Sequence, residues 1–336
     1  MDTDALEKAL PEEAKGYMEI TPESGDLKSG LAGIVKNLLF LLRESLRTSI
    51  SEGFTILSIA ALSGMARLFS GVSDSEPLKK AVDLASVCAV TALCISGASG
   101  VLESCSRSIG RLGNFSAALI PAYAAAVAVT GHPLSAVSTA SATLIFSNGL
   151  IFLASKLLIP AIYLHIVLSA AGLIADNPMI RGAAAMLRRG ALGFFKYFLM
   201  LYTGYVSMSG LISSGTDAVT LRTAKVTISG SVPVLGSIVS DVSDALLSGA
   251  VILKNAVGIY GFIGALAVCL LPFAATGAKL LVFRLLSLLS ASLCRGTLTQ
   301  LLNSISESYS MALGLLGTCC AVQFLSFVIG SVVIGA

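Results

Sequence analysis

The 336-residue sequence contains no tryptophan and only two histidines, and charged residues make up just 12% of it. Soluble domains carry about a quarter charged residues, so this chain lacks the polar surface that would keep it in solution. Apolar residues make up 55% of the chain, and its mean hydropathy is +0.88. Its repeated apolar stretches of roughly 18 residues or more are long enough to cross a bilayer core of about 30 Å. The composition therefore predicts an all-α, polytopic helical membrane protein.

Catalytic signatures are also missing. The sequence has no GxxxxGK[ST] phosphate-binding loop, no HExxH and no GxSxG. A histidine-based catalytic constellation is hard to build with only His132 and His165. None of the seven cysteines forms a CxxC pair, and no histidine lies at zinc-ligand spacing, so we interpret the cysteines as small buried apolar residues. We therefore expect neither an enzyme nor a metal or other cofactor.

Charge divides the chain into unequal parts. Residues 1–27 carry eight acidic residues against Lys8 and Lys15, a net charge of −6, which leaves +9 on the remainder. An acidic tail on a basic membrane body argues against a nucleic-acid partner. Residues 28–50 place their apolar side chains on one broad face, which is typical of a helix lying on a bilayer. We predict an acidic flexible tail at 1–27, an interfacial amphipathic helix at 28–50 and a transmembrane helical domain at 51–336.

Apolar runs separated by polar or charged turns predict eight to nine transmembrane helices. The expected spans are 54–70, 81–101, 114–130, two within 135–175, 191–212, 257–276, 278–294 and 311–335. With the N-terminus outside the cytoplasm, Lys79, Lys80 and the Arg181–Arg189 loop lie inside. The loop at Arg107 and Arg111 then lies outside.

Small residues recur within the spans, and Gly258, Gly261 and Gly264 follow one another at every third position. In lipid, such residues let helix backbones approach closely. This run predicts either a tightly packed bundle or an interface in a homo-oligomer.

The segment 221–256 is neither clearly polar nor a clear span. Gly230, Pro233 and Gly236 bracket a sharp break, because proline lacks an N–H and glycine admits otherwise strained dihedrals. Asp241 and Asp244 follow on one face of a helix whose opposite face is apolar. Two carboxylates on such a face are more often solvated charges than an acid–base pair. We therefore predict an amphipathic or re-entrant hairpin whose residues make contacts or line a pore.

Basic residues in or near the spans form a second group of candidates. Lys156 and Lys254 lie where an unpaired charge costs a few kcal/mol or more. They predict either a polar path or an ion pair between subunits, or else side chains that reach out to the lipid headgroups.

The hairpin segment resembles a known family. The run SGSVPVLG at Ser229–Gly236, the helix SDVSDALLSGA after it and LKNAVG at Leu253–Gly258 are similar to the signature region of stage III sporulation protein AE, a membrane protein of endospore formers. The order of the spans is similar as well, from about residue 28 onward. Members of that family usually begin with a cleavable signal peptide. This sequence shows none at its start, so we expect a processed or shortened start.

The resemblance implies a place in the channel, or feeding-tube, apparatus between mother cell and forespore. The protein would lie in the mother-cell membrane around the forespore. Its implied partners are the other proteins of the stage III sporulation A operon, including a secretion-type ATPase and ring-forming subunits, and a forespore-side channel protein. The rival hypothesis is a stand-alone small-solute transporter, which should show two similar halves with matched broken helices. The sequence offers one clear break of that kind, at Gly230–Gly236.

Overall fold

The computed structural model of the chain describes residues 27–72, 76–129, 133–231, 236–293 and 296–332. Throughout these ranges the backbone is helical apart from short turns, and they contain no strand. The predicted all-α class is therefore confirmed. The predicted tail, residues 1–27, lies outside the described residues except for its last position.

Seven α-helices and one π-helical segment make up the described part of the chain. In order they are α3 (Leu27–Val72), α4 (Glu76–Val129), α5 (Pro133–Leu153), the π-helical η1 (Ala154–Leu158), α6 (Ile159–Ile174), α7 (Pro178–Ser231), α8 (Gly236–Leu293) and α9 (Thr297–Val332). At about 1.5 Å per residue, the 54 residues of α4 and of α7 and the 58 of α8 extend well beyond a bilayer core of about 30 Å.

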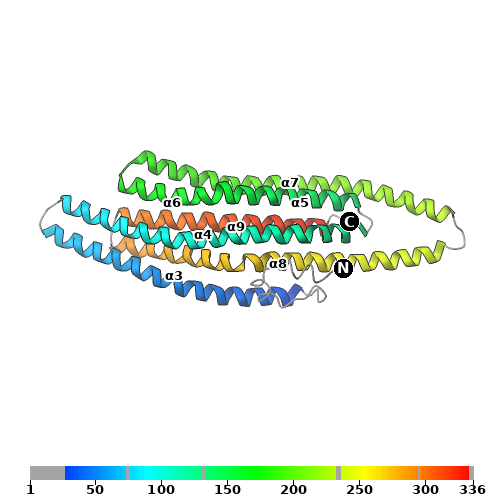
Figure 1. Cartoon of the computed structure of the whole chain (residues 1–336), viewed down its shortest axis with the longest axis horizontal. Helices are drawn as coiled ribbons and strands as arrows, with labels where there is room; N and C mark the ends of the chain where they lie inside the picture. Colours follow the sequence, from blue (N-terminus) through cyan, green and yellow to red (C-terminus); the bar gives the residue numbers. More distant parts are fainter. Residues whose placement is uncertain (1–26, 73–75, 130–132, 232–235, 294–295, 333–336) are drawn as a thin grey trace.

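The helices form an elongated bundle in which chain direction alternates (Figure 1). Helix α9 is central, because it contacts α4, α5, α6, α7 and α8. In Figure 1, α4 and α9 occupy the middle, with α5, α6 and α7 on one side and α3 and α8 on the other. Helix α4 likewise contacts α3, α5, α6, α8 and α9, so both of these middle helices can place polar side chains away from lipid.

Five helical stretches of the described residues are long and apolar enough to cross a membrane. They are Lys36–Ala66, Lys80–Pro121, Ala140–Ile174, Ile263–Ser292 and Thr297–Gln323. The membrane character of the chain is supported, but the predicted eight to nine spans are too many. The predicted span at 191–212 falls within α7, and none of the five candidate stretches lies in α7.

The prediction gave too many spans because it treated charged residues, glycine and proline as the ends of helices. Helix α4 continues through Glu103 and Arg107, because their side chains are exposed and do not interrupt the helix. Pro121 and Pro272 both lie inside helices, which membrane proteins tolerate where neighbouring groups satisfy the backbone. Two pairs of predicted spans, 81–101 with 114–130 and 257–276 with 278–294, are therefore single helices.

The serine-rich stretch 295–310, predicted to be a polar connection, is mostly the buried start of α9. Its hydroxyls bond within their own helix: Ser306 donates to the carbonyl of Asn303 at 2.7 Å, and Ser308 to that of Ser304 at 3.1 Å. Such local bonds let serine sit inside a helix without an unsatisfied polar group. The serines of this stretch therefore do not mark a loop.

The apolar run 135–175 was expected to hold two spans, but α5, η1 and α6 follow one another without a turn. Pro160 explains the π-helical segment just before it. A proline removes one backbone donor and crowds the carbonyl four residues earlier, and a wider turn relieves that clash. One candidate span, Ala140–Ile174, includes this segment.

The proposed interfacial helix 28–50 is continuous with the residues after it, since α3 runs unbroken from Leu27 to Val72. Its position on a bilayer stays a prediction. The predicted hairpin is clearer: α7 ends at Ser231 and α8 begins at Gly236, on either side of the expected break. In Figure 1 the two arms extend beyond all other helices at one end, so the hairpin does not fold back among them.

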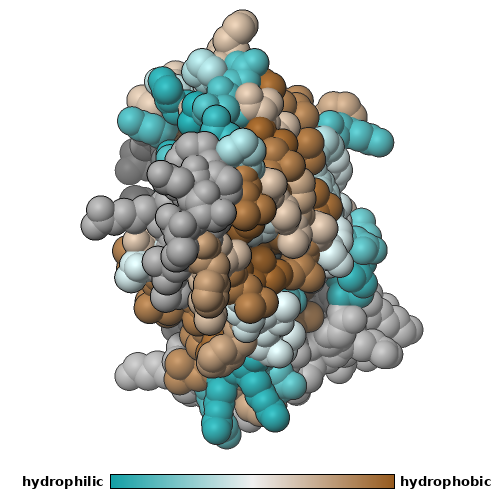
Figure 2. All heavy atoms as spheres, turned by 90° about the vertical axis from the view of Figure 1, so that its left-hand side faces the viewer, coloured by the Kyte–Doolittle hydropathy of each residue, from teal (hydrophilic) through white to brown (hydrophobic). Residues whose placement is uncertain are grey.

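Large apolar side chains face outward along the bundle. Phe54, Leu62 and Phe69 of α3 are 66–75% exposed, and Leu288 of α8 is 69% exposed. Figure 2 looks along the bundle from the end where α3 stops and α4 begins, and hydrophobic side chains cover the middle of this view between hydrophilic groups at its top and bottom. The exposed apolar side chains along α3 and α8 fit a lipid environment.

Close packing inside the bundle depends on small residues, as expected. A Cβ added to Gly264 of α8 would lie 2.5 Å from Cζ of Phe115, a side chain of α4 that is 1% exposed. This glycine therefore lets α4 and α8 approach, which supports the close-packing interpretation of the glycine run.

Substituting Gly264→Ala should destabilise the protein by about 1–3 kcal/mol, the usual cost of overpacking a filled core. Gly277→Ala is the matched control on the same helix, because nothing lies within 4 Å of its added Cβ. It should be neutral or gain up to about 1 kcal/mol from helix propensity. Thermal unfolding in lipid nanodiscs measures both, and equal midpoints for the two variants would contradict the packing argument.

Candidate functional site

An ion pair inside the bundle is the most unusual chemical feature of the structure. Nζ of Lys279 on α8 donates to Oε2 of Glu52 on α3. The lysine side chain is 8% exposed and the glutamate side chain 43%. Ionisable residues within membrane segments are costly, and by default they mark functional sites.

The ion pair lies near the middle of two candidate spans. Glu52 is 16 residues from Lys36 and 14 from Ala66, and Lys279 is 16 residues from Ile263 and 13 from Ser292. Lys279 thus lies about 20 Å along α8 from either end of its stretch, farther than a lysine side chain reaches. Glu52 follows the charged residues Arg43, Glu44 and Arg47 on α3, so the ion pair joins an apolar part of α8 to a more polar part of α3.

A glycine makes room for the pair. Gly97 of α4 faces it so closely that an added Cβ would lie 3.0 Å from Nζ of Lys279 and 3.2 Å from Oε2 of Glu52. Alongside runs a cleft of about 280 Å³, here called the central cleft. It is lined by Glu52, Thr55, Ile56, Leu93, Cys94, Ser96, Gly97, Phe283 and Tyr309. Four helices, α3, α4, α8 and α9, thus build one polar site.

Tyr309 of α9 lies at the floor of the central cleft. Its side chain is 2% exposed, and its ring packs against Phe283 with centroids 5.3 Å apart. Its hydroxyl has no hydrogen-bond partner among the described residues. A buried hydroxyl left unsatisfied costs about 1–3 kcal/mol, so this group marks a place where something else is expected to bond.

The chemistry of the cleft favours hydrogen bonding and charge compensation over catalysis. The carboxylate of Glu52, the phenol of Tyr309 and the thiol of Cys94 line the cleft, and the ammonium of Lys279 bonds to that carboxylate, but no nucleophile in the lining stands beside a general base. His165 is elsewhere, with Nδ1 2.8 Å from Oγ of Ser308. In the described ranges, no group of three or more His, Cys, Asp or Glu side chains could hold a metal ion.

Further polar links join α9 to its neighbours. Nη1 of Arg188 on α7 lies 3.2 Å from Oε1 of Glu307, and Nε2 of Gln323 donates to Oγ of Ser147 on α5 at 2.7 Å. Such bonds across membrane helices fix how the helices sit against one another. We interpret them as structural, since each contact joins two helices, although Oε1 of Gln323 has no hydrogen-bond partner among the described residues.

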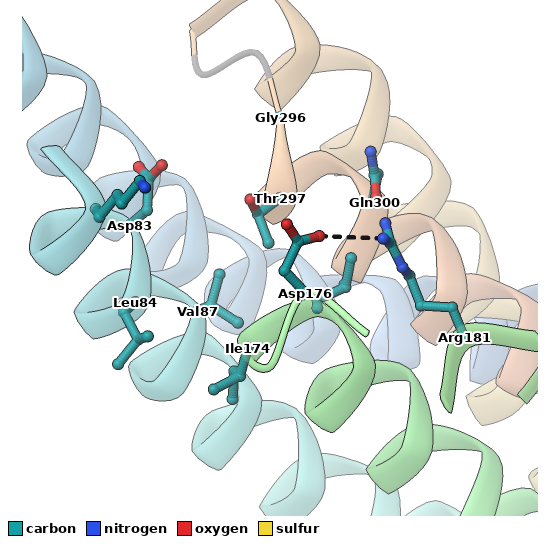
Figure 3. A pocket seen from close by; sticks show the side chains of 11 residues that line it. Asp83, Leu84, Val87, Ile174, Asp176, Arg181, Gly296, Thr297 and Gln300 are labelled. Atoms are coloured by element: carbon teal, nitrogen blue, oxygen red, sulfur yellow. Dashed lines mark hydrogen bonds and ion pairs between the residues drawn. The ribbon is translucent and has the colours of Figure 1, made fainter. Parts of the chain in front are cut away.

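A second hollow, the end pocket, has a volume of about 380 Å³. Figure 3 shows Asp83 and Leu84 of α4 on one side, Asp176 and Arg181 at the α6–α7 turn, and Thr297 and Gln300 of α9 facing them. The lining also includes Lys80, Val87, Leu173, Ile174 and Gly296. Nη2 of Arg181 donates to Oδ1 of Asp176 at 3.1 Å, but both side chains are exposed, so this ion pair contributes little to stability.

The α6–α7 turn at this pocket follows from its residues. Asp176 adopts a left-handed backbone with φ of 47°, a conformation that aspartate tolerates better than most residues. The side-chain oxygen of Asn177 then accepts a hydrogen bond from the backbone N–H of Met179 at 2.9 Å, which caps α7. Pro178 takes the first helical position, where its missing N–H costs nothing.

The structure does not gather the residues predicted from sequence into one site. Gly230 lies near the end of α7, and Gly236, Asp241, Asp244 and Lys254 lie on α8. Their side chains are not described, and Pro233 lies outside the described residues. Lys156 lies on η1, exposed and in the body of the bundle between α5 and α6, whereas the hairpin tip is at its far end. The roles of all seven stay predictions.

The sequence analysis did not predict Glu52, Cys94, Lys279 or Tyr309 as site residues. A signal was present for Lys279, which interrupts a long apolar stretch. Sequence spacing could not pair residues 227 positions apart. The interpretation of the cysteines as small buried residues holds for Cys94, Cys105, Cys269 and Cys319 but is wrong for Cys88, which is exposed.

Comparison with known proteins identifies the chain's relatives. The model of the family Stage III sporulation protein AE matches residues 13–336. A protein of Bacillus subtilis (strain 168) named Stage III sporulation protein AE is 30% identical over 225 residues, which cover 66% of this chain and 56% of that protein. The alignment thus spans little more than half the length of this relative. No solved structure matches the chain.

Proposed function

The chain belongs to the stage III sporulation protein AE family, and on that premise we propose that it is a membrane component of the channel apparatus between mother cell and forespore. The family match assigns a role in sporulation, in a family of structural proteins rather than known enzymes. The proposed part is a helical platform or conduit subunit in the mother-cell membrane around the forespore. Its partners would be the other stage III sporulation A proteins and the forespore-side channel protein.

The projecting α7–α8 hairpin is the observation that carries this proposal. Two long helices that extend past the rest of a membrane bundle provide a surface for other proteins outside the bilayer (Figure 1). The opposite end carries Lys80 and Arg181, which line the end pocket. Basic residues favour the cytoplasmic side, so the hairpin would point away from the mother-cell cytoplasm and toward the forespore.

Pull-down of the tagged full-length protein from sporulating cells tests the proposal. We expect the operon's ATPase, its ring-forming subunits and the forespore-side protein to be recovered. Asp241→Lys/Asp244→Lys on the hairpin should lower that recovery about tenfold or more, because reversed charges at an interface are strongly unfavourable. Asp176→Lys is the control, since its side chain is 90% exposed at the other end.

The rival, a stand-alone transporter, makes the opposite forecast. Purified protein in liposomes would take up a small solute without partners, and the pull-down would recover none of the apparatus. That combined result would overturn the proposal. Equal recovery with Asp241→Lys/Asp244→Lys and with the unaltered chain would place the contact away from these residues.

A further inference from the structure

We propose that the central cleft is filled with water and brings aqueous solution to the Glu52–Lys279 pair at the depth of the membrane-crossing segments. Its ligands are water and other small neutral hydrogen-bonding molecules. The inference rests on the membrane character of the bundle and not on the proposed channel role. A failure of one therefore leaves the other standing.

The lining of the cleft combines apolar and polar side chains. Its polar members are Glu52, Thr55, Ser96 and Tyr309. A water needs about 30 Å³ in the liquid and two to four polar partners. With about 280 Å³, the cleft has room for several waters, each within reach of such groups.

One group in the cleft has unused bonding capacity. The hydroxyl of Tyr309, 2% exposed, has no partner among the described residues and can both donate and accept. Because buried polar groups are nearly always hydrogen-bonded to protein or to ordered water, this hydroxyl points to bound water.

The charges select the kind of ligand. Glu52 and Lys279 compensate each other, so the cleft offers no net charge to a lone ion. An apolar lipid chain would leave the carboxylate, whose side chain is 43% exposed, facing hydrocarbon. Polar residues in membrane proteins face a bundle interior or a water-filled cavity for this reason. Water satisfies both charges without adding one.

The central cleft is open on one side. Thr55 of α3 and Leu93 and Ser96 of α4 are exposed, whereas Cys94 and Phe283 are buried. The cleft therefore opens between α3 and α4 and closes on α8 and α9.

Cysteine accessibility tests this directly in native membranes. The full-length chain, with its seven native cysteines replaced by alanine, receives Thr55→Cys or Ser96→Cys, both conservative changes at exposed positions. The probe is a charged, membrane-impermeant methanethiosulfonate, which reacts only with thiolates in water. Leu281→Cys is the matched control, because Leu281 is 51% exposed and lies two residues from Lys279 in the same span. Met179→Cys, at 83% exposure beside the end pocket, is the aqueous reference.

We expect Thr55→Cys and Ser96→Cys to react at least about a hundredfold faster than Leu281→Cys, because the bilayer interior excludes the charged reagent. Adding Glu52→Leu/Lys279→Met should slow Ser96→Cys and leave Met179→Cys unchanged. Labelling after denaturation in SDS shows that every variant carries its thiol. If both cleft cysteines react as slowly as Leu281→Cys while Met179→Cys reacts fast, the cleft holds lipid or protein and the proposal is wrong.

Discussion

Glu52→Ala is expected to destabilise the membrane-embedded protein by about 3–5 kcal/mol, the typical cost of removing one partner of a buried ion pair. The change leaves the ammonium of Lys279, whose side chain is 8% exposed, without the carboxylate that it pairs with. Unfolding in lipid nanodiscs, followed by temperature or denaturant, measures the loss. Because the site is shared by four helices, the unfolding midpoint of the whole bundle should fall.

The two partners should not be equivalent. Lys279→Met leaves a carboxylate whose side chain is 43% exposed toward a polar cleft, so we expect a smaller loss, about 1–3 kcal/mol. Glu52→Leu/Lys279→Met should recover much of the stability, because apolar replacement of a buried pair is often neutral. The double variant thus separates the cost of leaving one charge unpaired from the contribution of the ion pair to stability.

A surface pair provides the comparison. Asp176→Ala and Arg181→Ala remove an ion pair with side chains 90% and 40% exposed, and each should cost less than about 1 kcal/mol. If the losses from Glu52→Leu and Lys279→Met, each measured singly, simply add in Glu52→Leu/Lys279→Met, the two residues are not coupled. The assignment of an ion pair would then be wrong.

Replacing Gly230, Pro233 and Gly236 together by alanine is expected to abolish the formation of heat-resistant spores. Relative to alanine, glycine disfavours helix by about 1 kcal/mol and proline by about 3, so the triple change favours a helix through the break by about 5 kcal/mol. A helix continuing past Ser231 would prevent α7 and α8 from running antiparallel. Counting heat-resistant spores measures the effect.

Matched substitutions on α7 show whether the break itself matters. Gly182→Ala and Gly190→Ala have open space at the added Cβ, so spores should form normally. Immunoblotting of membrane fractions distinguishes loss of function from loss of protein. Normal spore counts with the triple variant would show that the hairpin break is dispensable, and would remove the main support for a partner contact there.

Composition and local pattern were sufficient for several properties of this protein. A mean hydropathy of +0.88 with 12% charged residues predicted a helical membrane protein, because a chain with so few charged residues lacks the polar surface that a soluble fold needs. The break between Gly230 and Gly236 was found at its place because backbone restrictions of glycine and proline are local. The hairpin motif likewise identified the family.

Tertiary packing decided the number of spans and the site. Whether Glu103, Pro121 or a serine such as Ser306 ends a helix depends on what packs around it, so local signals alone overcounted the spans. The Glu52–Lys279 pair depends on α3 and α8 lying side by side with Gly97 of α4 against them. In the sequence, Lys279 is a costly charge in an apolar run and Glu52 is one of several charged residues on α3, and only their contact in the folded bundle makes them one polar site.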